Sequence, residues 1–173
     1  NYSDLFASKD SGIKVVHYKG YEGLKTITWN STKANDVFRI FELNQDMTGF
    51  TDFDFAEKVR MEFVKNDLKE LRQITNLKRI LPWTNIEEFV EIVEFRYLNP
   101  SLLTMSAEII VYNDVVAMYS LKNKELVGIE IYNEQLADMQ KKTFDYIGFG
   151  NGIMFRHFIY QNFIPIQNFR EPI

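Results

Sequence analysis

The sequence of 173 residues contains no cysteine and only two histidines, His17 and His157. Without cysteine, disulfide bonds and thiolate metal sites are excluded, and two isolated histidines do not favour a histidine-based metal site either. The lack of cysteine fits a protein that is kept in a reducing compartment. We therefore expect a cytoplasmic protein that holds neither a metal ion nor another cofactor.

The sequence also lacks long apolar runs and a strong excess of one charge. No apolar run reaches the roughly 18 residues that a membrane-spanning helix requires, and no signal peptide is present. Lys and Arg number 20 against 24 Asp and Glu, so the net charge is −4, whereas nucleic-acid-binding domains usually carry a basic stripe. These absences argue against a membrane protein and against direct binding of nucleic acid by this chain.

What the sequence does contain is a large apolar fraction. Apolar residues make up 46% of the chain and aromatic residues 15%, which suggests an interface or a pocket in addition to the core. The length predicts one domain, which we place at residues 13–152 after a polar lead-in at residues 1–12. The tail at residues 153–173 is rich in Phe and Ile, so we expect it to pack on this domain or on a partner subunit.

The clearest pattern lies in the middle of the chain, from Ala107 onwards. Apolar alternation predicts three consecutive strands, over Ala107–Tyr112, Val115–Leu121 and Leu126–Tyr132. Asn113-Asp114 is typical of the two-residue turn of a tight hairpin, and Asn133 can cap a helix that starts near Glu134. The spacing in this helix predicts a core face formed by Leu136, Met139, Thr143, Phe144 and Ile147. We expect Asp138 to pair with Lys142, and Lys141 with Asp145, on the outer face.

The remaining segments predict further strands and helices. Strands are expected at Ile13–Tyr18, Val37–Leu43, Lys69–Thr75 and Ile92–Leu98, and helices at Tyr21–Lys33, Phe53–Lys65 and Asn85–Glu91, the last capped by Asn85. The first strand, helix and next strand predict a right-handed crossover with parallel pairing of the two strands. The fold class is therefore α/β, with α+β as the alternative, and consists of a mixed sheet with flanking helices.

Several of these segments resemble the C-terminal module of TrmB-type transcriptional regulators of archaea and bacteria. The matching pieces are Tyr112-Asn113-Asp114, Val116-Ala117, Ser120, Val127-Gly128-Ile129-Glu130-Ile131, Ala137, Phe144-Asp145, the segment from Val16 to Leu24, and Glu94-Phe95-Arg96-Tyr97-Leu98. The resemblance covers about Ile13 to Gly148. It implies a phospholipase D-like fold without catalytic residues, used for regulation and dimer formation. It also implies that DNA is bound only through a separate upstream winged-helix domain, and a sequence that starts at Asn1 leaves room for one.

A phospholipase D-like fold calls for a test of its catalytic pattern of His, Lys and a later Asp. His17-Tyr18-Lys19 has the first spacing, but the Asp position is Leu24, and His157 is followed by Phe158. We therefore expect no enzymatic activity. Gly20 and Gly23 lie at a strand-to-helix junction, but the third glycine of a dinucleotide-binding loop is missing. The two glycines therefore favour turn geometry over a phosphate-binding loop. The acidic residues Glu87, Glu88, Glu91 and Glu94 favour a solvated face over an acid–base pair.

Charged residues inside apolar strands are the best candidates for a ligand site. They are Arg39, Glu42, Arg72, Arg96 and Glu108, and they can converge at one end of the sheet. A buried charge must be paired by another side chain or by a ligand, so the alternatives are an effector pocket and purely structural ion pairs. Four aromatic residues can line such a pocket or fill the core, namely Trp29, Trp83, Tyr97 and Tyr112.

From these features we expect a non-enzymatic domain that forms a homodimer and senses a small-molecule effector within a transcriptional regulator. A ligand can act in such a domain only by binding one arrangement better than another. A stand-alone protein-interaction domain is the first alternative. An atypical phosphodiesterase-like hydrolase is the second.

Overall fold

The computed structural model describes residues 12–43, 52–77, 84–121 and 126–149. The strands are β1 (Lys14–Lys19), β2 (Val37–Phe41), β3 (Glu70–Thr75), β4 (Val93–Tyr97), β5 (Glu108–Tyr112), β6 (Val115–Ser120) and β7 (Val127–Tyr132). The helices are α1 (Gly20–Ser31), α2 (Phe53–Lys65), α3 (Glu87–Ile92) and α4 (Glu134–Gly148). Each predicted strand and helix exists, with ends that differ by a few residues. The lead-in up to Ser11 and the tail from 153 onwards lie outside the described residues.

The strands form one mixed sheet in the order β1-β7-β6-β5-β2-β3-β4. From β1 to β2 each strand is antiparallel to its neighbour, whereas β2, β3 and β4 are parallel. The predicted α/β class with a mixed sheet is therefore confirmed. The predicted pairing of the first two strands is wrong, because β7, β6 and β5 lie between β1 and β2. Strand β1 instead pairs antiparallel with β7, from Lys14 opposite Tyr132 to Lys19 opposite Val127.

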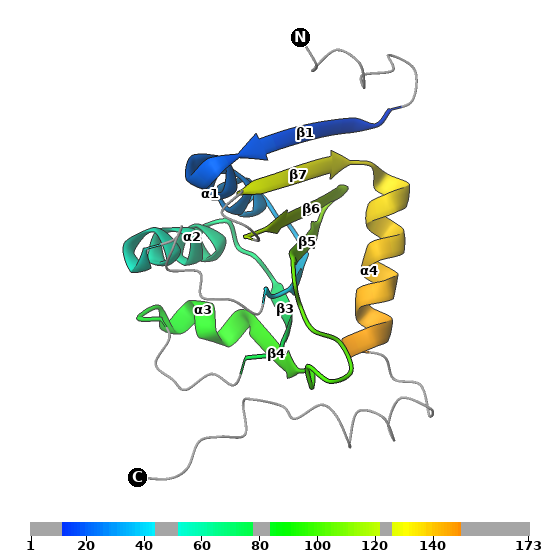
Figure 1. Cartoon of the computed structure of the whole chain (residues 1–173). Coiled ribbons are helices and arrows are strands. Elements are labelled where there is room, and N and C mark those ends of the chain that lie inside the picture. Colours follow the sequence, from blue (N-terminus) through cyan, green and yellow to red (C-terminus); the bar gives the residue numbers. More distant parts are fainter. Residues whose placement is uncertain (1–11, 44–51, 78–83, 122–125, 150–173) are drawn as a thin grey trace.

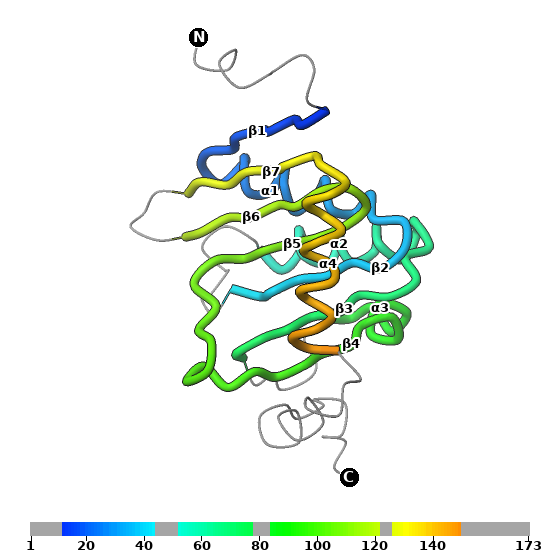
Figure 2. The backbone as a smooth tube through the Cα atoms, turned by 90° about the vertical axis from the view of Figure 1, so that its right-hand side faces the viewer, coloured from blue at the N-terminus to red at the C-terminus, as the bar shows by residue number. Residues whose placement is uncertain are grey.

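Helices cover both faces of the sheet and give a three-layer arrangement. Of the helices in the described residues, α1, α2 and α3 lie on one face and α4 lies on the other (Figure 1). Seen from the side of α4, this helix runs across the strands from β7 towards β4 (Figure 2). Among the described residues, α4 is the helix on this face, so its contact with the sheet holds this half of the fold together.

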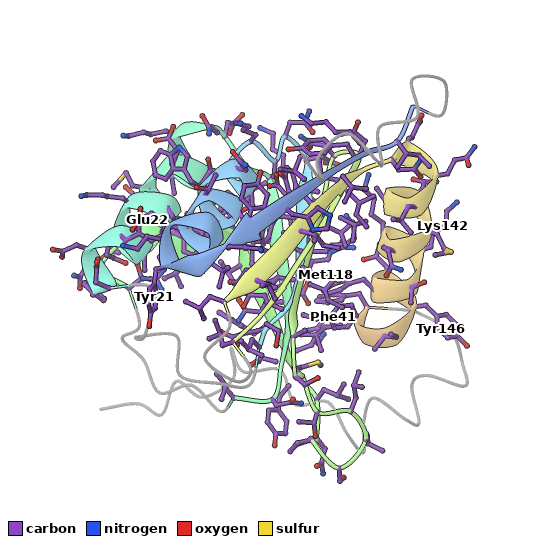
Figure 3. All side chains as sticks on the ribbon, turned by 45° about the horizontal axis from the view of Figure 1, so that its top comes forward. Tyr21, Glu22, Phe41, Met118, Lys142 and Tyr146 are labelled. Atoms are coloured by element: carbon purple, nitrogen blue, oxygen red, sulfur yellow. The ribbon has the colours of Figure 1, made fainter. Side chains whose placement is uncertain are left out.

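The packing between α4 and the sheet centres on Phe144, which is fully buried. Its ring meets Phe41 of β2 edge-on, with 4.8 Å between the ring centroids. Phe41 and Met118 lie on the side of the sheet that faces α4, whereas Tyr146 lies on the outer side of the helix (Figure 3). Full burial of a side chain such as Phe144 stabilises the fold by about 2–3 kcal/mol. Two predicted core residues of α4 are exposed, namely Met139, of which 54% is accessible to solvent, and Thr143.

Local signals in the sequence explain several ends of these elements. Asn113 adopts a φ of 45° in the hairpin between β5 and β6, a conformation that Asn tolerates better than most residues. The side chain of Asn133 caps α4, because its Oδ1 accepts a hydrogen bond of 2.7 Å from the amide of Leu136. The predicted cap at Asn85 is wrong. Helix α3 follows Ile86 instead, which has no capping side chain.

No helix in the part of the chain that the structure describes combines the length and apolar character needed to cross a membrane.

Candidate functional site

The five charged residues predicted for a ligand site do not come together. Arg39, Arg72 and Arg96 lie on the side of the sheet that faces α4. Glu108 lies on the other side of the sheet, where it accepts a hydrogen bond from Tyr119. Glu42 is buried just beyond the end of β2. The structure therefore contains an arginine cluster on the α4 side and buried carboxylates elsewhere.

The arginine cluster consists of three arginines, three acidic residues and one aromatic ring. Its members are Arg39, Arg72, Arg96, Glu70, Glu94, Asp145 and Phe149. The register of the parallel strands places Arg39 beside Arg72, and Arg72 beside Glu94. Because side chains alternate along a strand, these neighbours point to one face of the sheet. Asp145 reaches the same place from α4.

The contact between Arg39 and Asp145 is bidentate. Arg39 Nε donates to Asp145 Oδ1 over 3.0 Å, and Arg39 Nη2 donates to Oδ2 over 2.8 Å. Arg72 Nη1 adds a third bond of 3.0 Å to Oδ1, while Arg72 Nε and Nη2 hold Glu70 at 2.8 and 3.0 Å. Two parallel bonds from one guanidinium are among the strongest side-chain contacts with a carboxylate. One carboxylate thus joins α4 to both β2 and β3.

Phe149 completes the cluster just beyond the end of α4. The guanidinium carbons of Arg72 and Arg96 lie 5.2 and 4.9 Å from the centroid of its ring. The same ring stacks on Phe144, with the centroids 5.6 Å apart. A guanidinium over an aromatic face is attracted by the ring quadrupole. The charged cluster is therefore continuous with the apolar contact that holds α4 on the sheet. Arg96 also pairs with Glu94.

The charges of the cluster set the pKa of Asp145. Partial burial on its own raises this pKa, but the hydrogen bonds and positive charges of Arg39 and Arg72 outweigh that effect. The pKa of Asp145 therefore lies below its ordinary value of 3.8. The bonds to Glu70 and Asp145 raise the pKa of Arg72 against the opposing effect of burial. Asp145 and Arg72 are thus both charged at neutral pH.

Asp145 is the member that the sequence analysis assigned to the wrong partner. It was expected to pair with Lys141, whereas in the structure it pairs with Arg39 and Arg72. The other predicted pair, Asp138 with Lys142, is confirmed at 3.1 Å. One signal was available, because an acidic residue in the last turn of a helix faces the negative end of the helix dipole. Such a residue needs a cation from elsewhere in the fold.

A second polar cluster surrounds Glu130 on the side of the sheet that carries α1. Glu130 is fully buried, and its Oε2 accepts hydrogen bonds from Tyr18 at 2.6 Å, Tyr132 at 2.9 Å and Asn30 at 3.2 Å. Tyr112 lies 3.5 Å from the other oxygen. Neutral donors thus surround a buried carboxylate, which ties β1 and α1 to β7. The sequence pattern did not predict this cluster, although position 130 falls on the buried face of an alternating strand.

The tyrosines of these buried clusters are poor acids. Burial, followed by the bond to Glu130, raises the pKa of Tyr132 to about 12. The same two causes raise the pKa of Tyr18. Burial and the neighbouring Glu108 carboxylate likewise raise the pKa of Tyr119. These hydroxyl groups therefore stay protonated and act as hydrogen-bond donors to the carboxylates.

The other candidates are placed as follows. His17 is exposed on β1. Gly20 has a φ of 71°, and its amide donates to Leu126 O over 2.8 Å, which agrees with a turn. Glu87, Glu88 and Glu91 are exposed on α3. Of the aromatic residues, Tyr112 is buried, Tyr97 is half-buried, Trp29 is 42% exposed and Trp83 lies outside the described residues. Within the described ranges, no group of three or more His, Cys, Asp or Glu side chains is arranged to hold a metal ion.

In the part of the chain that the structure describes, a mixed sheet carries three helices on one face and α4 on the other. Among solved structures, the chain is similar to TrmBL2, described as an archaeal chromatin protein with a novel mode of DNA binding. The TM-score is 0.53 at 13% sequence identity, over 84% of this chain and 55% of TrmBL2, so the chain spans about half the length of that protein. It is also similar to NucT from Helicobacter pylori, with a TM-score of 0.48 and 14% identity, over 78% of this chain and 94% of NucT.

No protein-family model matches the sequence, and no curated protein matches it. The resemblance to TrmB-type regulators is thus supported at the level of the fold.

Proposed function

We propose that this chain is a non-catalytic regulatory domain that self-associates and responds to a small-molecule effector. The observation that carries the proposal is the use of the charged residues: each arginine of the cluster contacts a carboxylate, and together they anchor a helix. The likeness of the fold to an archaeal chromatin protein supports a regulatory context. We place the protein in the cytoplasm because its sequence has no cysteine.

The buried carboxylates support a structural rather than a catalytic role. General acid–base chemistry requires a group that can exchange a proton with a bound substrate. Glu130 is fully buried and accepts bonds from tyrosines, and Glu108 is held in the same way by Tyr119. With their raised pKa values, these tyrosines do not release protons at neutral pH. The domain accordingly acts through binding and shape.

A second copy of the chain is the partner that we propose, and the edge strand β1 is the surface. Strand β1 is terminal in the sheet that the described residues form, and a terminal strand can pair with another chain through its outer backbone groups. Val15 and Val127 on β1 and β7 are 37% and 46% exposed. Two copies that meet edge to edge about a two-fold axis would cover apolar side chains and extend both sheets.

The domain would then regulate DNA binding indirectly. The chain has a net charge of −4, so its own contacts with DNA would be weak. We propose that DNA is bound by a separate domain, and that the arrangement of two copies of this domain sets the spacing of two such DNA-binding domains. An effector would change DNA affinity by favouring one arrangement.

Light scattering on the full chain tests this proposal. We expect the mass of a dimer for the wild-type chain and the mass of a monomer for Val15→Glu, because the new charge lies on the edge strand β1 at the proposed interface. Met61→Glu is the matched control, since Met61 is 39% exposed on α2, away from β1, and this variant should remain a dimer. A wild-type chain that is monomeric would contradict the proposal and favour a domain that binds a different protein.

A further inference from the structure

We propose that the arginine cluster binds a small oxyanion, a carboxylate or a phosphate group, and that Asp145 occupies this site as an internal competitor. Binding of the anion would release the carboxylate of Asp145 and loosen the end of α4. This inference names the effector class for the regulatory domain and, as a mode of regulation, rests on the proposed function. The binding site itself rests on the contacts described below.

The donors for an oxyanion are already arranged. Arg39 presents Nε and Nη2 to two oxygens at 3.0 and 2.8 Å, and Arg72 directs Nη1 at one of the same oxygens. This is the fork geometry with which guanidinium groups bind carboxylate and phosphate groups. The Asp145 carboxylate therefore shows how the carboxylate of a ligand would sit. No rearrangement of β2 or β3 is needed for the exchange.

The charge balance favours replacement of one anion by another. The three arginines of the cluster face three carboxylates, those of Glu70, Glu94 and Asp145. If Asp145 moves away, the cluster retains an excess of one positive charge on partly buried arginines. Leaving such a charge without a partner is costly, so an incoming anion is bound in compensation.

The site is also partly open to solvent. The side chain of Asp145 is 33% exposed and that of Arg72 is 25% exposed, whereas Arg39 is only 11% exposed. An anion can therefore approach along the side of Asp145 and Arg72 and end on the less exposed Arg39. The ring of Phe149 lies under Arg72 and Arg96 and limits the orientations of these two guanidinium groups.

Release of Asp145 would change the surface of the domain. Three of the polar contacts between α4 and the sheet end on this one carboxylate. Without them, the last turns of α4 are held by the apolar contacts of Phe144 and Phe149. Helix α4 also carries the exposed residues Met139 and Tyr146. Displacement of the helix would therefore move apolar side chains that a partner can contact.

Titration of the full chain with inorganic phosphate at constant ionic strength tests the inference. In the wild-type chain Asp145 occupies the site most of the time, which lowers the apparent affinity for phosphate. In Asp145→Asn this internal competitor is neutral, so we expect phosphate to bind about tenfold more tightly. Asp138→Asn is the matched control. Asp138 lies on α4 and loses the same charge, but pairs with Lys142 away from the cluster, so its affinity should equal that of wild type.

A third variant links binding to the guanidinium groups. Arg39→Met should weaken phosphate binding at least tenfold in the Asp145→Asn chain, and should also weaken it in the otherwise unchanged chain. The second comparison holds even if Asp145→Asn does not fold. Equal affinities for Asp145→Asn and Asp138→Asn, or binding that is unaffected by Arg39→Met, would overturn the inference.

Two further comparisons separate the outcomes. A parallel titration with acetate distinguishes the sources of the oxyanion, because tighter binding of acetate than of phosphate to Asp145→Asn would assign the site to carboxylate ligands. The proposed function is tested separately by the mass of the chain. A monomer that binds phosphate at Arg39 would contradict the proposed self-association and support the anion site. A dimer that does not bind phosphate would support self-association and contradict the anion site.

Discussion

The contact between Arg39 and Asp145 should make a measurable contribution to folding. The perturbation is a double-mutant cycle of Arg39→Met, Asp145→Asn and the combined variant. Arg39→Met keeps an unbranched apolar stem of similar length, and Asp145→Asn keeps the shape of the side chain. The cycle removes the ion pair while changing little else, and it reports the coupling between the two side chains.

The magnitude follows from the geometry and exposure of the pair. Exposed ion pairs contribute about 0.2–1 kcal/mol, and removal of one partner from a buried pair costs about 3–5 kcal/mol. Here the side chain of Arg39 is 11% exposed and that of Asp145 is 33% exposed, so solvent screens one partner. Arg72 Nη1 also donates to Asp145, so we expect this contact to persist when Arg39 is replaced. A bidentate pair between these limits should have a coupling energy of about 1.5 kcal/mol.

Urea unfolding, followed by circular dichroism, provides the four free energies of unfolding. Similar dependence of these energies on urea concentration would show that the variants keep the same native and unfolded states. A coupling energy below about 0.3 kcal/mol would refute the reasoning, because that is within the additivity expected for independent sites. Asp145 would then be an ordinary surface residue without a role in holding α4.

Three further predictions concern packing, capping and pH. Gly128→Ala should lower the free energy of unfolding by about 1–3 kcal/mol, because its Cβ would overlap Ile27 Cδ1 and press on neighbouring β6 atoms. An unchanged urea midpoint would contradict this and show that the end of the Ile27 side chain can move away. Asn133→Ala should cost about 1 kcal/mol through loss of the cap on Leu136, and Asn133→Ser should restore most of it. The pKa of Asp145 is lowered, so its contribution is present above its unfolded pKa and is lost as pH falls through the folded pKa. The difference in unfolding free energy between wild type and Asp145→Asn should therefore be constant from about pH 5 to 8 and shrink below about pH 4.

The local elements could be predicted from the sequence because their signals are local. The turn at Asn113-Asp114 and the cap at Asn133 depend on residues within one or two turns of the chain. Apolar alternation likewise identified the strands on either side of the turn. The sheet order was harder to predict. Strand β1 pairs with β7 more than a hundred residues later, and the sequence around Lys14 carries no signal for that choice.

Some members of the arginine cluster could be picked out from the sequence, but their partner could not. The position of Arg39 and Arg72 in apolar strands indicated that these side chains need partners, and in the structure both pair with Asp145. Their partner was missed because Asp145 lies within helical reach of Lys141, and a local pair satisfies the pattern equally well. Only the placement of α4 across β2 and β3 decides between the two. Glu108 could not be assigned to a face before the register of β5 was known.

Hydrogen exchange of the full chain with and without inorganic phosphate tests most directly the claim that Asp145 ties α4 to the sheet in competition with an anion. We predict faster exchange of backbone amides in the last two turns of α4 when phosphate is present, and unchanged exchange in α2, which lies on the other face of the sheet. Exchange in α4 that is unchanged or slower with phosphate bound would contradict the account.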